Sequence, residues 1–291
     1  MHIVFATCLT QPAISTSDSI LARALEQRGV TVSGAPWNGA FEPFTQADGV
    51  LIRTTWDYFD HFPEFQLWLN QLETQGVRVQ NSLATLHWNI HKSYLFDLHN
   101  AGAPVLPMVA VEPKVASVQA AASQHGWRKA VLKCLVSGTA RGLSLFDSDS
   151  VEDIAKAIEV AQPWSEFGLV VQPFMPQIKT AGELSMVFVD GRFAHAVCKT
   201  PKAEEFRIQS EFGGRYERVQ PSEQALGAAA VCLEHAANKL DEWPLYARVD
   251  GLIIEDAFKL MELELAEPEL MFNLAPDAAE LMADALLARM S

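Results

Sequence analysis

The chain has 291 residues, 49% of them hydrophobic and 20% charged, which is the balance of an ordinary soluble globular protein. Its formal net charge of −14 argues against a nucleic-acid partner, because contacts to phosphate backbones need a basic face. No apolar run is long enough to span a membrane, and residues 1–10 resemble a first strand rather than a signal peptide. We therefore expect a cytoplasmic protein with no membrane partner, whose scattered cysteines are free thiols.

The first 85 residues alternate between strand and helix patterns. Strands are predicted at 2–7, 30–35, 49–56 and 77–82, and helices at 17–29 and 63–76. Such alternation is typical of a parallel sheet in an α/β layer. We assign residues 1–88 to an N-terminal α/β domain on the substrate side.

The remainder changes character along the chain. One helix is predicted at 83–102, followed by a compact α+β set that ends near residue 174. Two hairpins follow, the first turning at Asp190-Gly191, which is a strong signal for a two-residue turn. Long helices are expected at 222–240 and 276–290. The predicted units are a central helix with a lid subdomain at 89–174 and an antiparallel-sheet subdomain at 175–291.

Acidic residues alternate with leucines in the last predicted strand. Period-2 geometry places Glu262 and Glu264 on one face, and Asp250 lies across the hairpin on the preceding strand. Three carboxylates facing one another would suit Mg²⁺, which prefers hard oxygen ligands. Taken alone, however, the strand is explained as well by an edge strand with a solvated acidic face.

Two lysines and a glycine-rich loop indicate an anion site. Lys133 interrupts a hydrophobic strand and needs an anionic partner if it is buried. The loop SGTARG at 137–142 follows it and could present backbone N–H groups to phosphate oxygens, although it could equally be a flexible hairpin tip. It lacks the Walker spacing, and no GxGxxG follows a strand. Lys92 begins an amphipathic segment, where a surface lysine is the local alternative.

Further cations follow the first hairpin. Lys199 and Arg207 end two extended stretches, and the pair Gly213 and Gly214 comes shortly afterwards, which suggests an anion-binding loop. Arg248 shares a strand face with the metal-ligand candidates and could stabilise an oxyanion. The alternative for Arg248 is a cross-strand salt bridge to Glu262.

The segment RTTWDYFDHF at 53–62 follows a predicted parallel strand. Ligands of open α/β sheets bind beyond the carboxyl ends of strands, so Arg53, Trp56, Asp57 and Tyr58 could hold a polar substrate. A structural Arg–Asp pair among packed aromatic rings is the alternative. No Ser-His-acid order or GxSxG elbow appears, which weakens a hydrolase interpretation.

The order of these motifs over residues 85–275 resembles the ATP-grasp superfamily. YARVDGL and MELELAEP resemble its D-alanine ligase and bacterial glutathione synthetase branches. Combined with RTTWDY, HAVCKTP and FRIQ, they are most similar to the ligases that close O-ureidoserine to cycloserine, and to relatives of unassigned substrate. The resemblance implies an ATP-grasp fold that mixes α/β and α+β units.

The resemblance also implies roles for individual residues. Lys92 and Lys133 match the lysines that contact ATP phosphates, and Glu183 matches the acid that holds the ribose hydroxyls. Lys199, Arg207 and Arg248 match catalytic cations near the acyl phosphate. The lid loop over the phosphates corresponds to Ser137, Gly138, Arg141 and Gly142. The hinge that reads adenine corresponds to Gln172, Pro173, Phe174 and Met175.

The implied metal triad is Asp250, Glu262 and Glu264, where Glu264 replaces the usual Asn and adds negative charge. Gln172 stands where many members carry Glu. Gln209 and Glu267 are implied to lie beside the substrate.

The implied function is an ATP-dependent carboxylate–amine or cyclising ligase that acts through an acyl phosphate and releases ADP and phosphate. It would use ATP with Mg²⁺, or alternatively Mn²⁺, on small carboxylate and amine substrates, and a homodimer is one expectation. Two alternatives stay open: an ATP-binding protein with a regulatory role, and an ordinary α/β domain with a solvated acidic edge.

Overall fold

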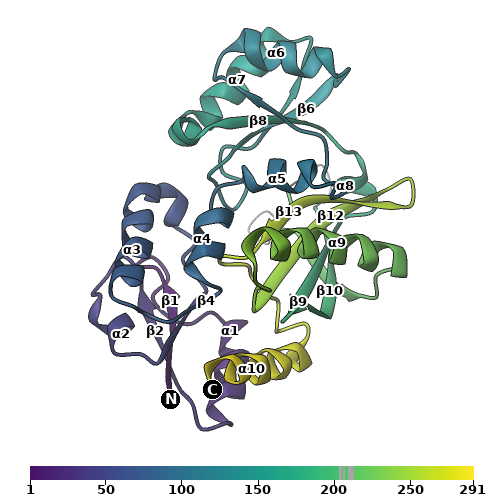
Figure 1. Ribbon diagram of the computed structural model, residues 1–291. Helices are drawn as coiled ribbons and strands as arrows, with labels where there is room; N and C mark the ends of the chain where they lie inside the picture. The colour runs from purple at the N-terminus through teal and green to yellow at the C-terminus, as the bar shows by residue number, and fades with distance from the viewer. Residues whose placement is uncertain (203–204, 206, 209–212) are drawn as a thin grey trace.

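The computed structural model of the chain describes residues 1–291 except 203–204, 206 and 209–212 (Figure 1). Three sheets divide the described part into an N-terminal unit, a lid unit and a C-terminal unit. Figure 1 shows the lid unit at one end, with the other two units side by side below it. The mixed α/β and α+β prediction is confirmed.

The N-terminal sheet is parallel and has the order β2-β1-β3-β4. Its strands are β1 (His2–Thr7), β2 (Thr31–Pro36), β3 (Gly49–Ile52) and β4 (Val79–Gln80). Helices α1 (Asp18–Glu26), α2 (Glu42–Thr45) and α3 (Phe62–Thr74) and the 3₁₀ turn η1 (Tyr58–Asp60) connect them. Ile3 to Ala6 are fully buried, as expected for a central parallel strand covered on both faces.

The lid unit holds an antiparallel sheet of order β5-β8-β6-β7. The strands are β5 (Val109–Val111), β6 (Lys129–Cys134), β7 (Ser144–Asp147) and β8 (Leu169–Pro173). Helices α6 (Val115–Gln124) and α7 (Val151–Ala161) cover this sheet (Figure 1), and η2 (Gln162–Phe167) leads into β8. The predicted hairpin around the glycine-rich loop is therefore formed by β6 and β7.

The C-terminal sheet is antiparallel and has the order β11-β10-β9-β12-β13. The strands are β9 (Glu183–Val189), β10 (Arg192–Thr200), β11 (Arg215–Val219), β12 (Tyr246–Ile254) and β13 (Ala257–Glu264). Helix α8 (Gln177–Thr180) precedes it and α9 (Glu223–Leu240) packs on it. Asp190 and Gly191 both have positive φ, 49° and 74°, so the predicted two-residue turn is confirmed.

The single helix predicted at 83–102 is wrong. The structure has two helices, α4 (Leu83–Asn89) and α5 (Tyr94–Asn100). At the break, the backbone N–H of Lys92 donates to the carbonyl of Leu135 in the lid unit, 2.8 Å away, instead of to its own helix. A tertiary hydrogen bond therefore outweighs the helical pattern and aims Lys92 at the lid.

The last helix, α10 (Pro276–Met290), packs against the first elements of the chain. Its buried residues Ala279, Met282 and Ala283 share a core with Ile3 and Phe5 of β1. Figure 1 shows α10 lying beside α1. The segment between β13 and α10 consequently crosses from the C-terminal sheet to the N-terminal unit, which draws Glu267 and its neighbours along the boundary between them.

Gly251 allows the close register of β12 and β13. The pairing shifts between Asp250 and Gly251, and a Cβ at Gly251 would lie 2.3 Å from the carbonyl oxygen of Lys259.

We expect Gly251→Ala to lower the free energy of unfolding by about 1–3 kcal/mol through overpacking. The matched control is Gly227→Ala on the exposed face of α9, where nothing lies within 4 Å and a gain of up to about 1 kcal/mol is expected. Urea unfolding measures both, and equal effects would contradict the prediction.

Candidate active site

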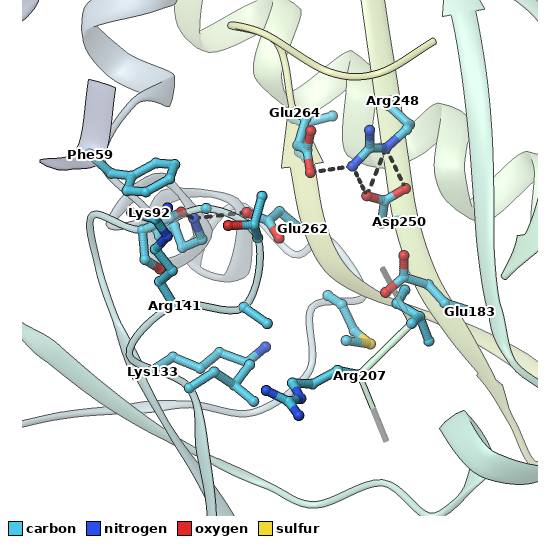
Figure 2. A pocket seen from close by; sticks show the side chains of 18 of the residues that line it. Phe59, Lys92, Lys133, Arg141, Glu183, Arg207, Arg248, Asp250, Glu262 and Glu264 are labelled. Atoms are coloured by element: carbon cyan, nitrogen blue, oxygen red, sulfur yellow. Dashed lines mark hydrogen bonds and ion pairs between the residues drawn. The ribbon is translucent and has the colours of Figure 1, made fainter. Parts of the chain in front are cut away.

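A cavity of about 830 Å³ lies where the three units meet, and most sequence-predicted site residues line it (Figure 2). The predicted residues along its wall are Trp56, Asp57, Tyr58, Lys92, Lys133, Ser137, Gly138, Arg141, Gln172, Pro173, Phe174, Met175, Glu183, Lys199, Arg207, Arg248, Asp250, Glu262, Glu264 and Glu267. Side chains separated by up to about two hundred positions in the sequence therefore face one space.

Strands β12 and β13 form an acidic ribbon along one side of the cavity. Asp250 lies directly opposite Glu262, and Arg248 lies opposite Glu264. The Arg248 guanidinium donates through Nε to both carboxylate oxygens of Asp250, at 3.0 and 2.9 Å, and also forms an ion pair with Glu264 (Figure 2). The alternative Arg248–Glu262 bridge is wrong, because the register puts Glu264 opposite the arginine.

Glu262 is paired from outside the ribbon. The Lys92 ammonium lies 2.9 Å from Glu262 Oε1 and donates to the carbonyl oxygen of Ser137 at 2.6 Å. One lysine therefore links the helix break, the acidic ribbon and the glycine-rich loop.

Lys133 on β6 faces the cavity from the lid side (Figure 2). Among the described residues no carboxylate lies within ion-pair distance of its ammonium. Burial lowers the pKa of Lys133, although the charge of Glu262 partly opposes this. Lys133 is half-buried, and the cavity that it faces leaves room for a ligand to supply an anionic partner.

A second buried charge group lies on β9 and β10. Lys199 Nζ is 3.3 Å from Glu183 Oε1 and 3.8 Å from Asp250 Oδ1, and all three side chains are almost fully buried. Arg207, which also lines the cavity, forms an ion pair with Glu205 at 2.6 Å. Lys199 is therefore tied to the acidic ribbon, whereas Arg207 approaches the cavity from the opposite wall.

Apolar side chains form one end of the cavity around the predicted adenine hinge. Sequence reasoning identified the hinge but missed the other residues of this end. They are Leu106, Met108, Val131, Ile178, Leu252 and Met261. They come from β6, α8, β12, β13 and the segment before β5, so only the tertiary fold brings them together. An apolar end of a cavity of this kind suits a purine ring.

Arg53 does not reach the cavity. It is 1% exposed, forms an ion pair with Asp18 at 2.9 Å, donates to the carbonyl oxygen of Pro268 at 2.8 Å and lies over the Tyr246 ring. Its contacts are those of a structural residue, with Asp18 as the partner instead of Asp57. Asp57 lines the cavity but accepts hydrogen bonds from Trp37 Nε1 and Asn38 Nδ2.

Three other predicted residues are not brought into the cavity. Gly142 turns toward Cys134, whose Sγ would lie 2.6 Å from an added Cβ, and its φ of 68° serves the loop conformation. Gly213 and Gly214 precede β11 away from the cavity wall. Gln209 lies outside the described residues. The sequence analysis also missed Phe59 and Asp60, which line the cavity directly after RTTWDY.

The acidic side of the cavity carries more negative charge than its cations balance. Burial raises the pKa of Glu264 to about 8 and that of Glu183 and Glu267 to about 7. Burial also acts on Asp250, but the charges of Arg248 and Lys199 outweigh it and hold its pKa below the ordinary value.

This donor set fits a divalent cation in its chemistry, since all the ligands are carboxylate oxygens in charge excess. In the described part of the chain, no three His, Cys, Asp or Glu side chains are already gathered at metal-binding distances. Asp250, Glu262 and Glu264 are instead bonded to Arg248 and Lys92. A bound cation would have to replace those contacts.

The cavity is thus lined by Lys133 from the sheet of the lid unit and by the carboxylates of β12 and β13 from the C-terminal sheet. No helix in the described ranges combines the length and apolarity needed to cross a bilayer.

Comparisons with known proteins show the class of protein to which the chain belongs. Residues 99–256, more than half of the chain, match the family model for the ATP-grasp domain of prokaryotic glutathione synthetase, and residues 3–81 match that for the N-terminal domain of D-cycloserine synthetase DcsG. The cycloserine biosynthesis protein DcsG of Streptomyces lavendulae is 25% identical over 281 residues, covering 93% of this chain and 92% of that protein.

Solved structures show the same fold. The crystal structure of D-cycloserine synthetase DcsG superposes with a TM-score of 0.89 at 21% identity, covering 100% of both chains. D-alanine–D-alanine ligase from Bacillus anthracis gives 0.73 at 14% identity, covering 100% of this chain and 97% of that one.

The chain belongs to the ATP-grasp family of prokaryotic glutathione synthetase type. It is an ATP-dependent ligase, and the family acts through an acyl phosphate and uses ATP with a divalent metal.

The raised glutamate pKa values predict an unusual pH dependence of stability. Because Glu267 has a folded pKa of about 7, the folded chain holds a proton there that the unfolded chain releases near the ordinary value of 4.5. Its favourable contribution is complete below that ordinary value and is lost as the pH rises through about 7.

We therefore expect Glu267→Gln to gain stability relative to the parent protein as pH increases, with a slope of up to about 1.4 kcal/mol per pH unit. Urea unfolding across this range, without nucleotide or metal, measures the difference. A difference that does not change with pH would contradict the assignment.

Proposed function

We propose that the cavity binds ATP across its lid side and a small molecule carrying both a carboxylate and an amine on its N-terminal side. The observation that carries this proposal is that, in the described part of the chain, a cation and a carboxylate without ion-pair partners lie on different sides of the cavity. Lys133 lacks a carboxylate partner among the described residues, whereas Glu267 lies on the acidic side with no cation bonded to it there. A phosphate fits the first position and an ammonium group the second.

The nucleotide would lie along the hinge. Its adenine would occupy the apolar end of the cavity beside Phe174 and Met175, and its phosphates would lie between Lys92, Lys133 and the glycine-rich loop. Gln172 has an amide nitrogen that lacks a partner among the described residues although its side chain is buried, so it could donate to the base.

Asp250, Glu262 and Glu264 would hold Mg²⁺, which neutralises phosphate charge when it is bound. In the absence of the usual Asn, Glu264 supplies one more negative charge, which favours tighter retention of the divalent cation. On phosphate binding, Lys92 is the side chain placed to exchange its Glu262 contact for phosphate oxygens, since it already reaches the loop at Ser137.

Arg248 would steady the oxyanion that forms when the amine attacks the activated carboxylate. Its Nη1 donates to the carbonyl oxygen of Glu269 at 3.0 Å, a contact that does not involve the proposed metal ligands. A cation held by Asp250 and Glu264 would release the other guanidinium nitrogens toward the oxyanion. The guanidinium is therefore fixed at the cavity wall before the reaction, which is the arrangement that oxyanion stabilisation needs.

Glu267 is held in place by Trp56 and Arg53 of the N-terminal unit and by Tyr246 of β12. Trp56 Nε1 donates to its carbonyl oxygen at 3.0 Å, Arg53 donates to the next carbonyl, and the Tyr246 hydroxyl donates to the preceding one at 3.0 Å. With the backbone fixed on three consecutive residues, the carboxylate projects from a rigid segment. We assign it to the substrate ammonium group.

The test is release of ADP and phosphate from Mg·ATP in the presence of a panel of small amino acids and their hydroxylamine and ureido derivatives. A ligase releases both products only with its substrates. An ATP-binding regulator of the same fold would bind Mg·ATP without substrate-dependent release, and that outcome would overturn the proposal.

Arg248→Lys should separate binding from turnover. Lysine keeps the charge that Asp250 and Glu264 require but loses the fixed guanidinium fork. We expect Mg·ATP affinity to change little while kcat falls by about 10²–10³. Isothermal titration and the ADP-release assay measure the two quantities, and near-parental turnover would exclude the oxyanion role.

Glu267→Gln should act on the amine side alone. The amide keeps the shape of the side chain but removes the charge, so we expect KM for the amine-bearing substrate to rise about tenfold, the effect of losing one charged hydrogen bond. Affinity for Mg·ATP should stay unchanged. Asp57→Asn is a matched control, because Asp57 lines the same cavity with its oxygens committed to Trp37 and Asn38. If both variants altered KM equally, the specific role of Glu267 would be wrong.

A further inference from the structure

The glycine-rich loop at 137–142 is held in an unfavourable conformation. Thr139 and Ala140 have φ values of 49° and 59°, in the left-handed region that residues with a Cβ rarely adopt. Such a backbone persists only where its surroundings impose it. Successive residues of this kind can point several N–H groups toward one anion.

The contacts that impose this conformation come largely from the N-terminal unit. The Arg141 guanidinium forms an ion pair with Asp60. It also lies over the Phe59 ring, 5.0 Å from its centre; Figure 2 labels both residues. The same ring covers Gly138 so closely that a Cβ there would lie 2.5 Å from it. Phe59 and Asp60 of η1 therefore contact the loop near both of its ends, at Gly138 and at Arg141.

Both carboxylate oxygens of Asp60 bind side chains of the lid unit. Its Oδ2 pairs with Arg141, and its Oδ1 accepts a hydrogen bond from Trp164 Nε1 at 3.0 Å. Beside it, Phe62 and Phe167 meet edge to face with ring centres 4.9 Å apart. A carboxylate on the N-terminal unit is thus directed wholly at the lid unit.

We propose that Phe59 and Asp60 are positioning residues that hold the glycine-rich loop in its phosphate-binding conformation, so that the substrate-side unit controls the order of the ATP lid. They act through Arg141 and Gly138. Since η1 begins at Tyr58, two residues after Trp56, a substrate bound beside Trp56 adjoins Phe59 and Asp60. The proposal rests on the phosphate-binding role of the loop given above.

The direct test is tryptic cleavage after Arg141, which is exposed and lies in the loop. We expect Asp60→Asn and Phe59→Leu to be cut at this bond about two- to fivefold faster than the parent protein, the effect expected from losing a partly exposed ion pair or a ring contact to a cation. Asp149→Asn is the matched control, because it removes an exposed ion pair to Arg128 elsewhere on the lid unit.

A second readout distinguishes loop order from general damage. We expect both variants to bind a non-hydrolysable Mg·ATP analogue about two- to fivefold more weakly while binding adenosine with parental affinity, because the loop faces only the phosphates. A single cooperative urea transition shows that the fold is intact, although Phe59→Leu also removes part of a buried ring. A variant that loses stability without faster cleavage at Arg141 counts against the proposal.

The two hypotheses fail separately. If the parent protein binds no Mg·ATP analogue, the proposed function is wrong. Cleavage after Arg141 then still tests whether Phe59 and Asp60 order the loop. If cleavage and nucleotide binding in Asp60→Asn and Phe59→Leu match those of Asp149→Asn, the positioning role of Phe59 and Asp60 is wrong. That conclusion does not depend on which ligand the cavity binds.

Discussion

Carboxylates gathered on one face of β12 and β13 repel one another, and the architecture of the cavity follows from how that repulsion is offset. Arg248 lies within the ribbon and binds Asp250 and Glu264, while Lys199 from β10 adds a second buried charge. Because an unpaired buried charge is strongly destabilising, these contacts constrain the positions of neighbouring strands. Burial raises the pKa of Glu264 even though the Arg248 charge opposes the shift, so the guanidinium does not fully offset the cost of burying this carboxylate.

Lys92 extends this constraint to the lid. Its ammonium reaches Glu262, and its backbone N–H bonds to Leu135, so the chain must leave its helix at this point. Asn89, one turn earlier, bonds to the backbone of Leu263 on β13 and of Leu265 just after it. The segment formed by α4 and the following break therefore connects the acidic ribbon to the lid unit. The break in the helix is what allows Lys92 to contact both.

The segment RTTWDYFDHF divides between structure and function. Arg53 is buried with Asp18, whereas Trp56 anchors the backbone beside Glu267. Phe59 and Asp60 turn toward the lid. One short stretch thus contacts the core of its own unit, the substrate wall and the glycine-rich loop, which explains why its aromatic and charged residues alternate without a simple period.

The sequence by itself determined the order and type of the principal elements, because strand and helix periodicities and the Asp190-Gly191 turn are local properties. It also indicated the acidic ribbon, since period 2 puts Glu262 and Glu264 on one face. The partners of those acids were decided only by the tertiary structure. The pairing of Arg248 with Glu264, the break before Lys92, the burial of Arg53 and the contact of Asp60 with Arg141 all depend on strand register or on units distant in sequence. Local pattern carries no information about such distances, so these features required the fold.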